Sequence, residues 1–206
     1  MKLFPVWLGA FFLAACAALP TAQKPAAAPA FDLAGYLEAH PAPRAFELLG
    51  RVVLASPQAR FLGKISWRHR PEEDILVITD DWGMTVAQLQ RLGDDAVLVT
   101  KDGRWRGMDV YELLGEVTDM DIPPGILFWI SGRPKGMGAQ ELIIGQDGTL
   151  SGFVEDGWKV SLGGHTREDG LLLPRRISVR GEKSRIALSI SQWKLDSDNP
   201  SLPPRS

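Results

Sequence analysis

The stretch Ser184-Arg-Ile-Ala-Leu-Ser-Ile-Ser-Gln-Trp-Lys-Leu195 decides the class of fold. Ile186, Leu188 and Ile190 alternate with small or polar residues. Because successive side chains of a β-strand point to opposite faces, this alternation predicts a strand with one strongly apolar face. Such a strand must cover other hydrophobic groups, so the stretch predicts a sheet with a buried side.

The same rhythm continues outward from this stretch, back to residue 46. Short β-like runs are separated by Gly, Asp or Pro, as expected for an antiparallel sheet. The predicted strands are Phe46–Leu54, Arg60–Arg68, Asp74–Thr79, Met84–Arg91, Asp95–Thr100, Gln140–Gly145, Leu150–Glu155, Trp158–Leu162, Leu173–Arg180 and Ser184–Leu195. No internal repeat interrupts them, so one continuous sheet in one domain is the simplest arrangement.

Three segments carry helical patterns instead. Asp109–Val117 begins with the spacing of a capping box and has an apolar stripe. Gly125–Ser131 follows two prolines and is apolar nearly all round, so we expect it to be buried or to cap a cavity. Phe31–His40 is a weaker amphipathic candidate.

Composition argues against several classes of function. The 206 residues carry a formal net charge of -2 and no long Lys/Arg cluster, so we expect no nucleic-acid partner. The one Cys cannot form a disulfide framework, and the 3 His residues lack metal-binding spacing. No Gly-x-Ser-x-Gly elbow or Walker motif occurs. The sequence therefore predicts a protein that is not an enzyme and holds no metal or dissociable cofactor.

Residues 1–15 have the layout of a cleavable signal. Lys2 precedes an apolar run that is too short to span a bilayer, and Leu13-Ala-Ala-Cys16 resembles the bacterial lipobox. This resemblance implies that Cys16 carries a diacylglycerol group and an N-acyl chain. An ordinary signal with a chance cysteine is the alternative. Ala17, where aspartate would mark inner-membrane retention, implies an outer-membrane destination.

Three further parts follow the signal. Residues 16–30 are rich in Ala and Pro and are predicted to form a flexible tether behind the lipid. Residues 31–195 are predicted to form the folded domain. Residues 196–206 are rich in Ser, Asp and Pro and are predicted to form a flexible tail.

A tryptophan stands where a hairpin is predicted. The run Asp74-Ile-Leu-Val-Ile-Thr-Asp-Asp-Trp-Gly-Met84 places an apolar strand before a turn that contains Trp82 and Gly83. A tryptophan at a loop tip either folds back on the core or points outward. Pointing outward, it suits the interfacial layer of a membrane, where its ring is apolar and its N–H stays wet.

The order of short motifs along the chain resembles the LolB family of outer-membrane lipoprotein receptors. The matching pieces are the lipobox, Phe46-x-Leu-x-Gly50-Arg51, Gly63-x-Ile-x-Trp67, the Thr79-to-Gly83 hairpin, Pro123…Leu127-x-Trp129-x-x-Gly132-x-Pro134, Gly157-Trp158-x-Val160, Leu173-Pro174 and Ile190-x-x-Trp193. Together they cover nearly the whole chain after the signal.

This resemblance implies a mainly β fold with a few helices, a half-open antiparallel β-barrel around a hydrophobic cavity with a helical lid. Asp109–Val117 and Pro124–Ser131 would form the lid. Candidate residues of the cavity and lid are Ile65, Trp67, Val77, Leu113, Leu127, Trp129 and Ile130; the alternative is that they fill an ordinary core. Arg51 is a further candidate, with an exposed strand arginine as the plainer interpretation.

The resemblance also implies a function. Proteins similar to LolB accept acylated lipoproteins from a soluble periplasmic carrier, LolA-like, and insert them into the outer membrane without nucleotide hydrolysis. The expected partners are therefore that carrier, the acyl chains of cargo lipoproteins and outer-membrane lipid, and the expected state is a monomer. In the family a protruding hydrophobic residue, usually leucine after proline, promotes insertion; Asp81-Trp82 stands here, so that role of Trp82 is a hypothesis.

Two other functions stay open on the sequence. A lipid- or glycolipid-binding lipoprotein would use the same cavity for a different cargo. A structural lipoprotein of an envelope assembly complex would instead have a filled core and no room for a ligand.

Overall fold

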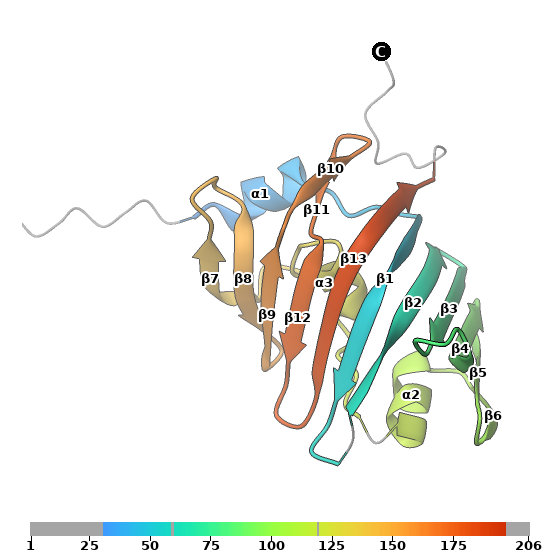
Figure 1. Ribbon diagram of the computed structural model, residues 1–206. Helices are drawn as coiled ribbons and strands as arrows, with labels where there is room; N and C mark the ends of the chain where they lie inside the picture. The colour runs from blue at the N-terminus through green and yellow to red at the C-terminus, as the bar shows by residue number, and fades with distance from the viewer. Residues whose placement is uncertain (1–30, 59, 119, 197–206) are drawn as a thin grey trace, which may run out of the picture. The chain divides into compact units, whose positions relative to one another are not determined.

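A large antiparallel sheet builds the described part of the chain, which in the computed structural model comprises residues 31–58, 60–118 and 120–196. Eleven described strands pair in the order β6-β5-β4-β3-β2-β1-β13-β12-β9-β8-β7 (Figure 1). Their bounds are β1 Phe46–Ala55, β2 Arg60–Arg70, β3 Glu73–Thr79, β4 Thr85–Leu92, β5 Asp95–Thr100, β6 Gly103–Gly107, β7 Gln140–Ile144, β8 Leu150–Glu155, β9 Trp158–Gly163, β12 Arg176–Arg180 and β13 Arg185–Leu195. Among the described residues β6 and β7 do not pair with each other, so the fold is a half-open antiparallel barrel.

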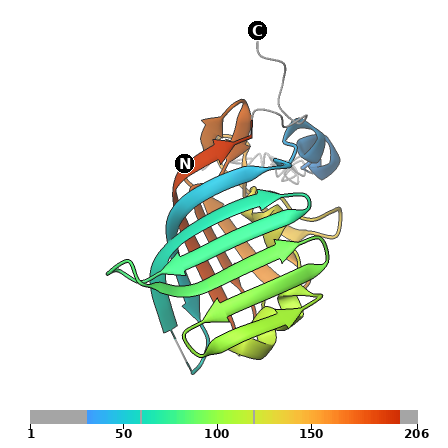
Figure 2. The ribbon, with the colours of Figure 1, turned by 90° about the vertical axis from the view of Figure 1, so that its right-hand side faces the viewer.

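Helices accompany this sheet. Within the described ranges they are α1 Leu33–Ala39, α2 Val110–Thr118 and α3 Ile126–Ile130. Figures 1 and 2 show the strands curving around α2 and α3, while α1 lies near one end of the sheet. The first helix begins where the side chain of Asp32 accepts a hydrogen bond from the Gly35 N–H.

The alternation in the last strand is confirmed. Ile186, Leu188 and Ile190 are buried, whereas Arg185 and Ser189 are exposed. A β-bulge shifts the register between β1 and β13 at Leu49 and Gly50. A Cβ atom at Gly50 would lie 2.4 Å from the Ser189 carbonyl oxygen, so only glycine fits at this crossing.

The compact unit from Asp32 onward carries its own hydrophobic core. One cluster of buried residues extends over the strands and α3, and a smaller cluster of Leu89, Ala96, Leu98 and Leu113 lies under α2. Every described core residue lies between Leu33 and Leu195. The predicted signal, the lipidation site Cys16, the tether and all of the predicted tail except Asp196 lie outside the described residues.

The predicted strand Leu173–Arg180 is wrong in one respect, because the structure divides it. Leu171–Leu173 (β11) pairs with Thr166–Glu168 (β10) in a separate two-stranded sheet, and β12 joins the large sheet. Pro174 between them has no N–H to give to a ladder, and its carbonyl accepts a 3.0 Å bond from Trp193 Nε1. The strands β6 and β10 were not predicted.

Candidate functional site: an apolar cavity between sheet and helices

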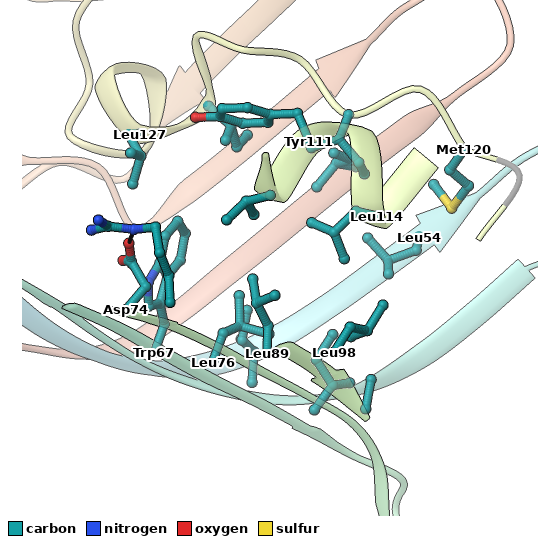
Figure 3. A pocket seen from close by; sticks show the side chains of 18 of the residues that line it. Leu54, Trp67, Asp74, Leu76, Leu89, Leu98, Tyr111, Leu114, Met120 and Leu127 are labelled. Carbon is teal, nitrogen blue, oxygen red and sulfur yellow. Dashed lines mark hydrogen bonds and ion pairs between the residues drawn. The ribbon is translucent and has the colours of Figure 1, made fainter. Parts of the chain in front are cut away.

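A cavity of about 420 Å³ lies between the concave face of the sheet and the two helices α2 and α3 (Figure 3). Its volume falls within the range of small-molecule sites, roughly 300–1,000 Å³. Aliphatic side chains from both layers form most of its wall: Val52, Leu54, Ile65, Leu76, Ile78, Leu89, Leu98, Ile186 and Leu188 from the strands, and Val110, Leu114, Ile126, Leu127 and Ile130 from the helices. Such a wall offers an extended hydrocarbon contact.

The wall also contains polar residues, of which Asp74 is buried. The carboxylate of Asp74 is buried and accepts hydrogen bonds from Trp67 Nε1 at 2.9 Å, His69 Nδ1 at 2.7 Å and Arg91 Nε at 2.6 Å. Arg91 also donates to the carbonyls of Arg70 at the end of β2, of Pro71 in the β2–β3 turn and of Gly93 in the β4–β5 turn. The group therefore fixes three strands and two turns at one end of the cavity.

These partners also decide the charge of Asp74. Burial alone would raise the pKa of Asp74, but the hydrogen bonds from His69 and Trp67, the charge of His69 and the bond from Arg91 together hold it below its ordinary value. The carboxylate is thus ionised at neutral pH and fully paired. The Asp74 carboxylate therefore stabilises the wall of the cavity and does not act as a free acid there.

Tyr111 of α2 brings a phenol to the same wall. Burial raises the pKa of Tyr111, and the carboxylates of Asp74 and Asp109 raise it further. The hydroxyl is therefore neutral at physiological pH.

The structure brings together four of the candidates predicted for the cavity and lid. Ile65, Trp67, Leu127 and Ile130 line the hollow. The side chain of Trp67 forms the wall beside Asp74, as Figure 3 shows.

Leu113 and Trp129 lie elsewhere. Leu113 of α2 packs against β4 and β5 in the smaller core cluster and is not among the residues that line the cavity. Trp129 is completely buried in α3 and donates from Nε1 to Glu155 Oε2 at 2.6 Å. Both residues hold helices on the sheet, which is a core role.

Val77 was predicted as a cavity wall, and this placement is wrong. In β3 the residues that face the cavity are Asp74, Leu76 and Ile78, so Val77 points to the opposite, convex face. There it lies beside Leu49 and Ser66. Because β3 is apolar on both faces, hydrophobicity alone does not decide which face points inward. The face that carries Asp74 points inward, where Asp74 meets Trp67 and Arg91.

The hairpin between β3 and β4 exposes its tryptophan. Trp82 is 89% exposed, so it does not fold back on the core. The Asp80 carboxylate accepts hydrogen bonds from the N–H groups of Trp82 and Met84, and Gly83 adopts a φ of 87°, which favours glycine. These contacts hold the tip in one conformation.

Arg51 lies at the base of this hairpin and not in the cavity. Its guanidinium contacts the Asp81 carboxylate at 2.8 Å, and both side chains are about half exposed. The pair joins β1 to the hairpin on the convex side of the sheet. Because it is exposed to solvent, its contribution to stability is small, roughly 0–1 kcal/mol.

Several wall residues were not singled out from the sequence, among them Leu54, Leu76, Leu98 and Leu114. The alternation within each strand could have indicated them, once the inward face was known. The described residues contain no group of three or more potential metal ligands. In the same part of the chain, no helix has the length and apolar character to cross a membrane.

Known proteins resemble this chain in sequence and in fold. The family described as outer membrane lipoprotein LolB matches residues 44–193 of this chain. The chain belongs to the LolB family. The outer-membrane lipoprotein LolB of Aeromonas salmonicida is 26% identical over 152 residues, which cover 73% of this chain and 77% of the relative. That of Shewanella loihica is 29% identical over 157 residues, covering 73% and 71%.

A solved structure shares the fold of this LolB-family chain. It is a DUF1329 family protein from Desulfovibrio piger, with a TM-score of 0.50 and 8% identity, covering 82% of this chain and 92% of that one. Membership of the LolB family makes the protein an outer-membrane lipoprotein with a part in lipoprotein localisation, not an enzyme. The cavity also argues against a purely structural protein with a filled core.

Proposed function

We propose that this protein receives the acyl chains of lipoproteins in its cavity from a LolA-like periplasmic carrier and releases them into the inner leaflet of the outer membrane. It acts as a monomer, anchored through lipid on Cys16, and uses no nucleotide. The hairpin that carries Trp82 and Gly83 promotes the release step by entering the lipid.

The observation that carries this proposal is the aliphatic hollow between the sheet and the helices. An acyl chain that moves from one apolar cavity to another gains or loses little hydrophobic free energy, because neither end of the step exposes hydrocarbon to water. A modest difference in affinity then sets the direction of transfer, and entry into a bilayer completes it.

A neighbouring pair of residues tests the role of the cavity. Leu76→Trp places an indole in the hollow, whereas Val77→Trp places it on the outer face of the same strand. We expect Leu76→Trp to reduce acceptance of a lipoprotein from the carrier by about tenfold or more, the equivalent of roughly 1.4 kcal/mol. Val77→Trp should accept cargo like the unchanged protein, and equal acceptance by both variants would remove the cavity from the function.

The release step is tested separately. Trp82→Glu should leave acceptance from the carrier intact while slowing delivery into liposomes, because a carboxylate is costly in the interfacial layer. Delivery at the unchanged rate would exclude the hairpin from the step. Mass spectrometry of co-purified lipid decides between protein-linked and free acyl chains; an abundant free lipid or glycolipid would favour a lipid-binding lipoprotein.

A further inference from the structure

The convex face of the sheet carries two rows of cations that run across neighbouring strands. The strand registers align Lys64 of β2, Arg51 of β1, Ser189 of β13 and Arg176 of β12 in one row. Four residues further along β1, they align Arg60 of β2, Ala55 of β1, Arg185 of β13, Arg180 of β12 and Lys159 of β9. We call the seven basic residues of these rows the cationic face.

Their alternation with buried residues places these side chains on one surface. The neighbours of the basic residues in each strand, such as Val52, Ile186 and Val179, point into the core. All members of the cationic face are exposed. From β2 to β9 the face crosses four strand spacings, about 19 Å.

Little on the protein neutralises this charge. Of the cationic face only Arg51 has an ion pair among the described residues, with Asp81. The rows themselves contain no carboxylate, and the exposed acids closest in sequence, Asp156 and Glu182, lie in the β8–β9 and β12–β13 turns. Because the whole chain has a net charge of -2, the cationic face is a local concentration of charge and not a sign of a basic protein.

The exposed tryptophan stands beside this face. Thr79 at the end of β3 pairs with Lys64, and Arg51 holds Asp81 in the turn that follows. Figure 2 shows the β3–β4 hairpin projecting to the left, the side on which β1 and β13 present their convex surface. The hairpin that carries Trp82 and the neighbouring Met84, which is 69% exposed, therefore projects on the same side as the cations.

We propose that the cationic face is a docking surface for anionic phospholipid headgroups, with Trp82 and Met84 entering the interface beside it. Apolar residues at the tip and basic residues behind them match the two layers of an anionic membrane surface. Docking would hold the cavity close to the bilayer, and this role rests on the proposed function. The binding itself is independent of any cargo.

Vesicle binding tests this proposal with a matched pair of variants. Both are made in a chain that begins at Ala17, which keeps the compact unit with its own core. Arg60→Gln, Arg180→Gln and Arg185→Gln together remove three charges from the cationic face. Lys101→Gln, Arg104→Gln and Arg106→Gln together remove three exposed charges in β6 and the turn before it, at the far edge of the sheet. Equal unfolding midpoints establish that all three proteins are folded alike.

Sedimentation with phosphatidylcholine vesicles, with and without phosphatidylglycerol, gives the partition coefficients. Each basic residue near an anionic surface contributes roughly a factor of five, so we expect the first triple variant to bind phosphatidylglycerol vesicles about a hundredfold more weakly than the unchanged protein. The β6 variant should stay within about threefold. High salt should abolish the difference, and pure phosphatidylcholine vesicles should show none.

Three results would overturn the proposal. These are unchanged binding by the first triple variant, an equal loss in the β6 variant, and equal binding of the unchanged protein to neutral and anionic vesicles. Acceptance of cargo from the carrier in solution, without vesicles, is measured in parallel. A defect of the first triple variant in that assay alone would assign the cationic face to the carrier and also refute membrane docking, whereas failure of acceptance by the unchanged protein would refute the proposed function only.

Discussion

Two regions of the inner face of the sheet carry the same apolar alternation, but one region is tightly packed and the other borders a cavity. Around α3, residues from three strands are packed to near-complete burial, with Trp129, Phe153, Val160 and Val179 each at most 1% exposed. Around α2, Leu76 and Ala87 are only half buried and face a hollow. We call these regions the solid side and the hollow side.

A buried carboxylate holds a tryptophan on each side. On the solid side Glu155 accepts from Trp129 Nε1 and from the N–H groups of Lys135 and Gly136. On the hollow side Asp74 accepts from Trp67, His69 and Arg91.

The difference lies in what the tryptophan does. The Trp129 ring fills the centre of its side and contacts Phe153 edge to face at 6.3 Å between centroids. The Trp67 ring stands in the wall, against Phe46, and leaves the centre to aliphatic side chains that do not meet. In this protein the hydrogen bonds of Asp74 fix Trp67 in the wall of the cavity, and aliphatic side chains form the rest of that wall.

The largest effect is expected on the solid side. Trp129→Ala should lower the free energy of unfolding by about 3–5 kcal/mol, because it leaves a large cavity and removes one donor from Glu155. Urea denaturation measures the change. Trp129→Phe keeps most of the ring and should lose less; a loss below about 1 kcal/mol for the alanine variant would contradict the division into two sides.

A smaller effect is expected from the frame of the hollow side. Asp74→Asn should cost about 1–3 kcal/mol near pH 7, because it removes the charge that one buried and two partly buried donors share. Since the folded-state pKa of Asp74 is lowered, its stabilisation is present above the ordinary carboxyl pKa and is lost as pH falls through the lowered value.

Urea titrations from about pH 7 down to about pH 2 test this sign, because the difference between the two proteins should begin to shrink only as the pH falls below the ordinary carboxyl range, about 4. Asp102→Asn, at a side chain that is 70% exposed, is the control and should follow the unchanged protein at every pH. A constant difference between Asp74→Asn and the unchanged protein over the whole range would mean that the lost charge is not the cause.

The smallest effect is expected at the cavity wall. Leu76→Ala should cost on the order of 1 kcal/mol or less, because its side chain already borders empty space. Leu150→Ala, at a completely buried position in β8, is the matched change on the solid side and should cost about 2–5 kcal/mol. Equal losses in urea denaturation would show that the hollow is packed in solution.

The strand pattern was predictable because it depends on neighbouring residues in the sequence. Alternation such as that of Ile186 and Leu188 identifies both the strand and its buried face. The separation of β11 from β12 was missed because Pro174, the residue that divides them, lay inside an otherwise β-like run. The β6 strand was missed because Gly103 and Gly107 bound a run of only five residues.

The cavity wall was predictable only in part. Val77 was placed inside because β3 is apolar on both faces, and the face is decided by the Asp74–Arg91 bond between residues 17 apart. No local pattern reveals that partner. Exposure of Trp82 likewise depends on Asp80, whose bonds to the turn only the structure provides.

The aliphatic wall determines how this protein distinguishes ligands by length. Each methylene that enters the hollow contributes about 0.8 kcal/mol, and the mainly aliphatic wall adds little further selection between straight chains. Affinity for straight-chain fatty acids should therefore rise by a constant factor per carbon and then level off once the space of about 420 Å³ is full. The chain length at that plateau measures how many carbons the cavity holds, and saturated chains shorter than this length should also bind.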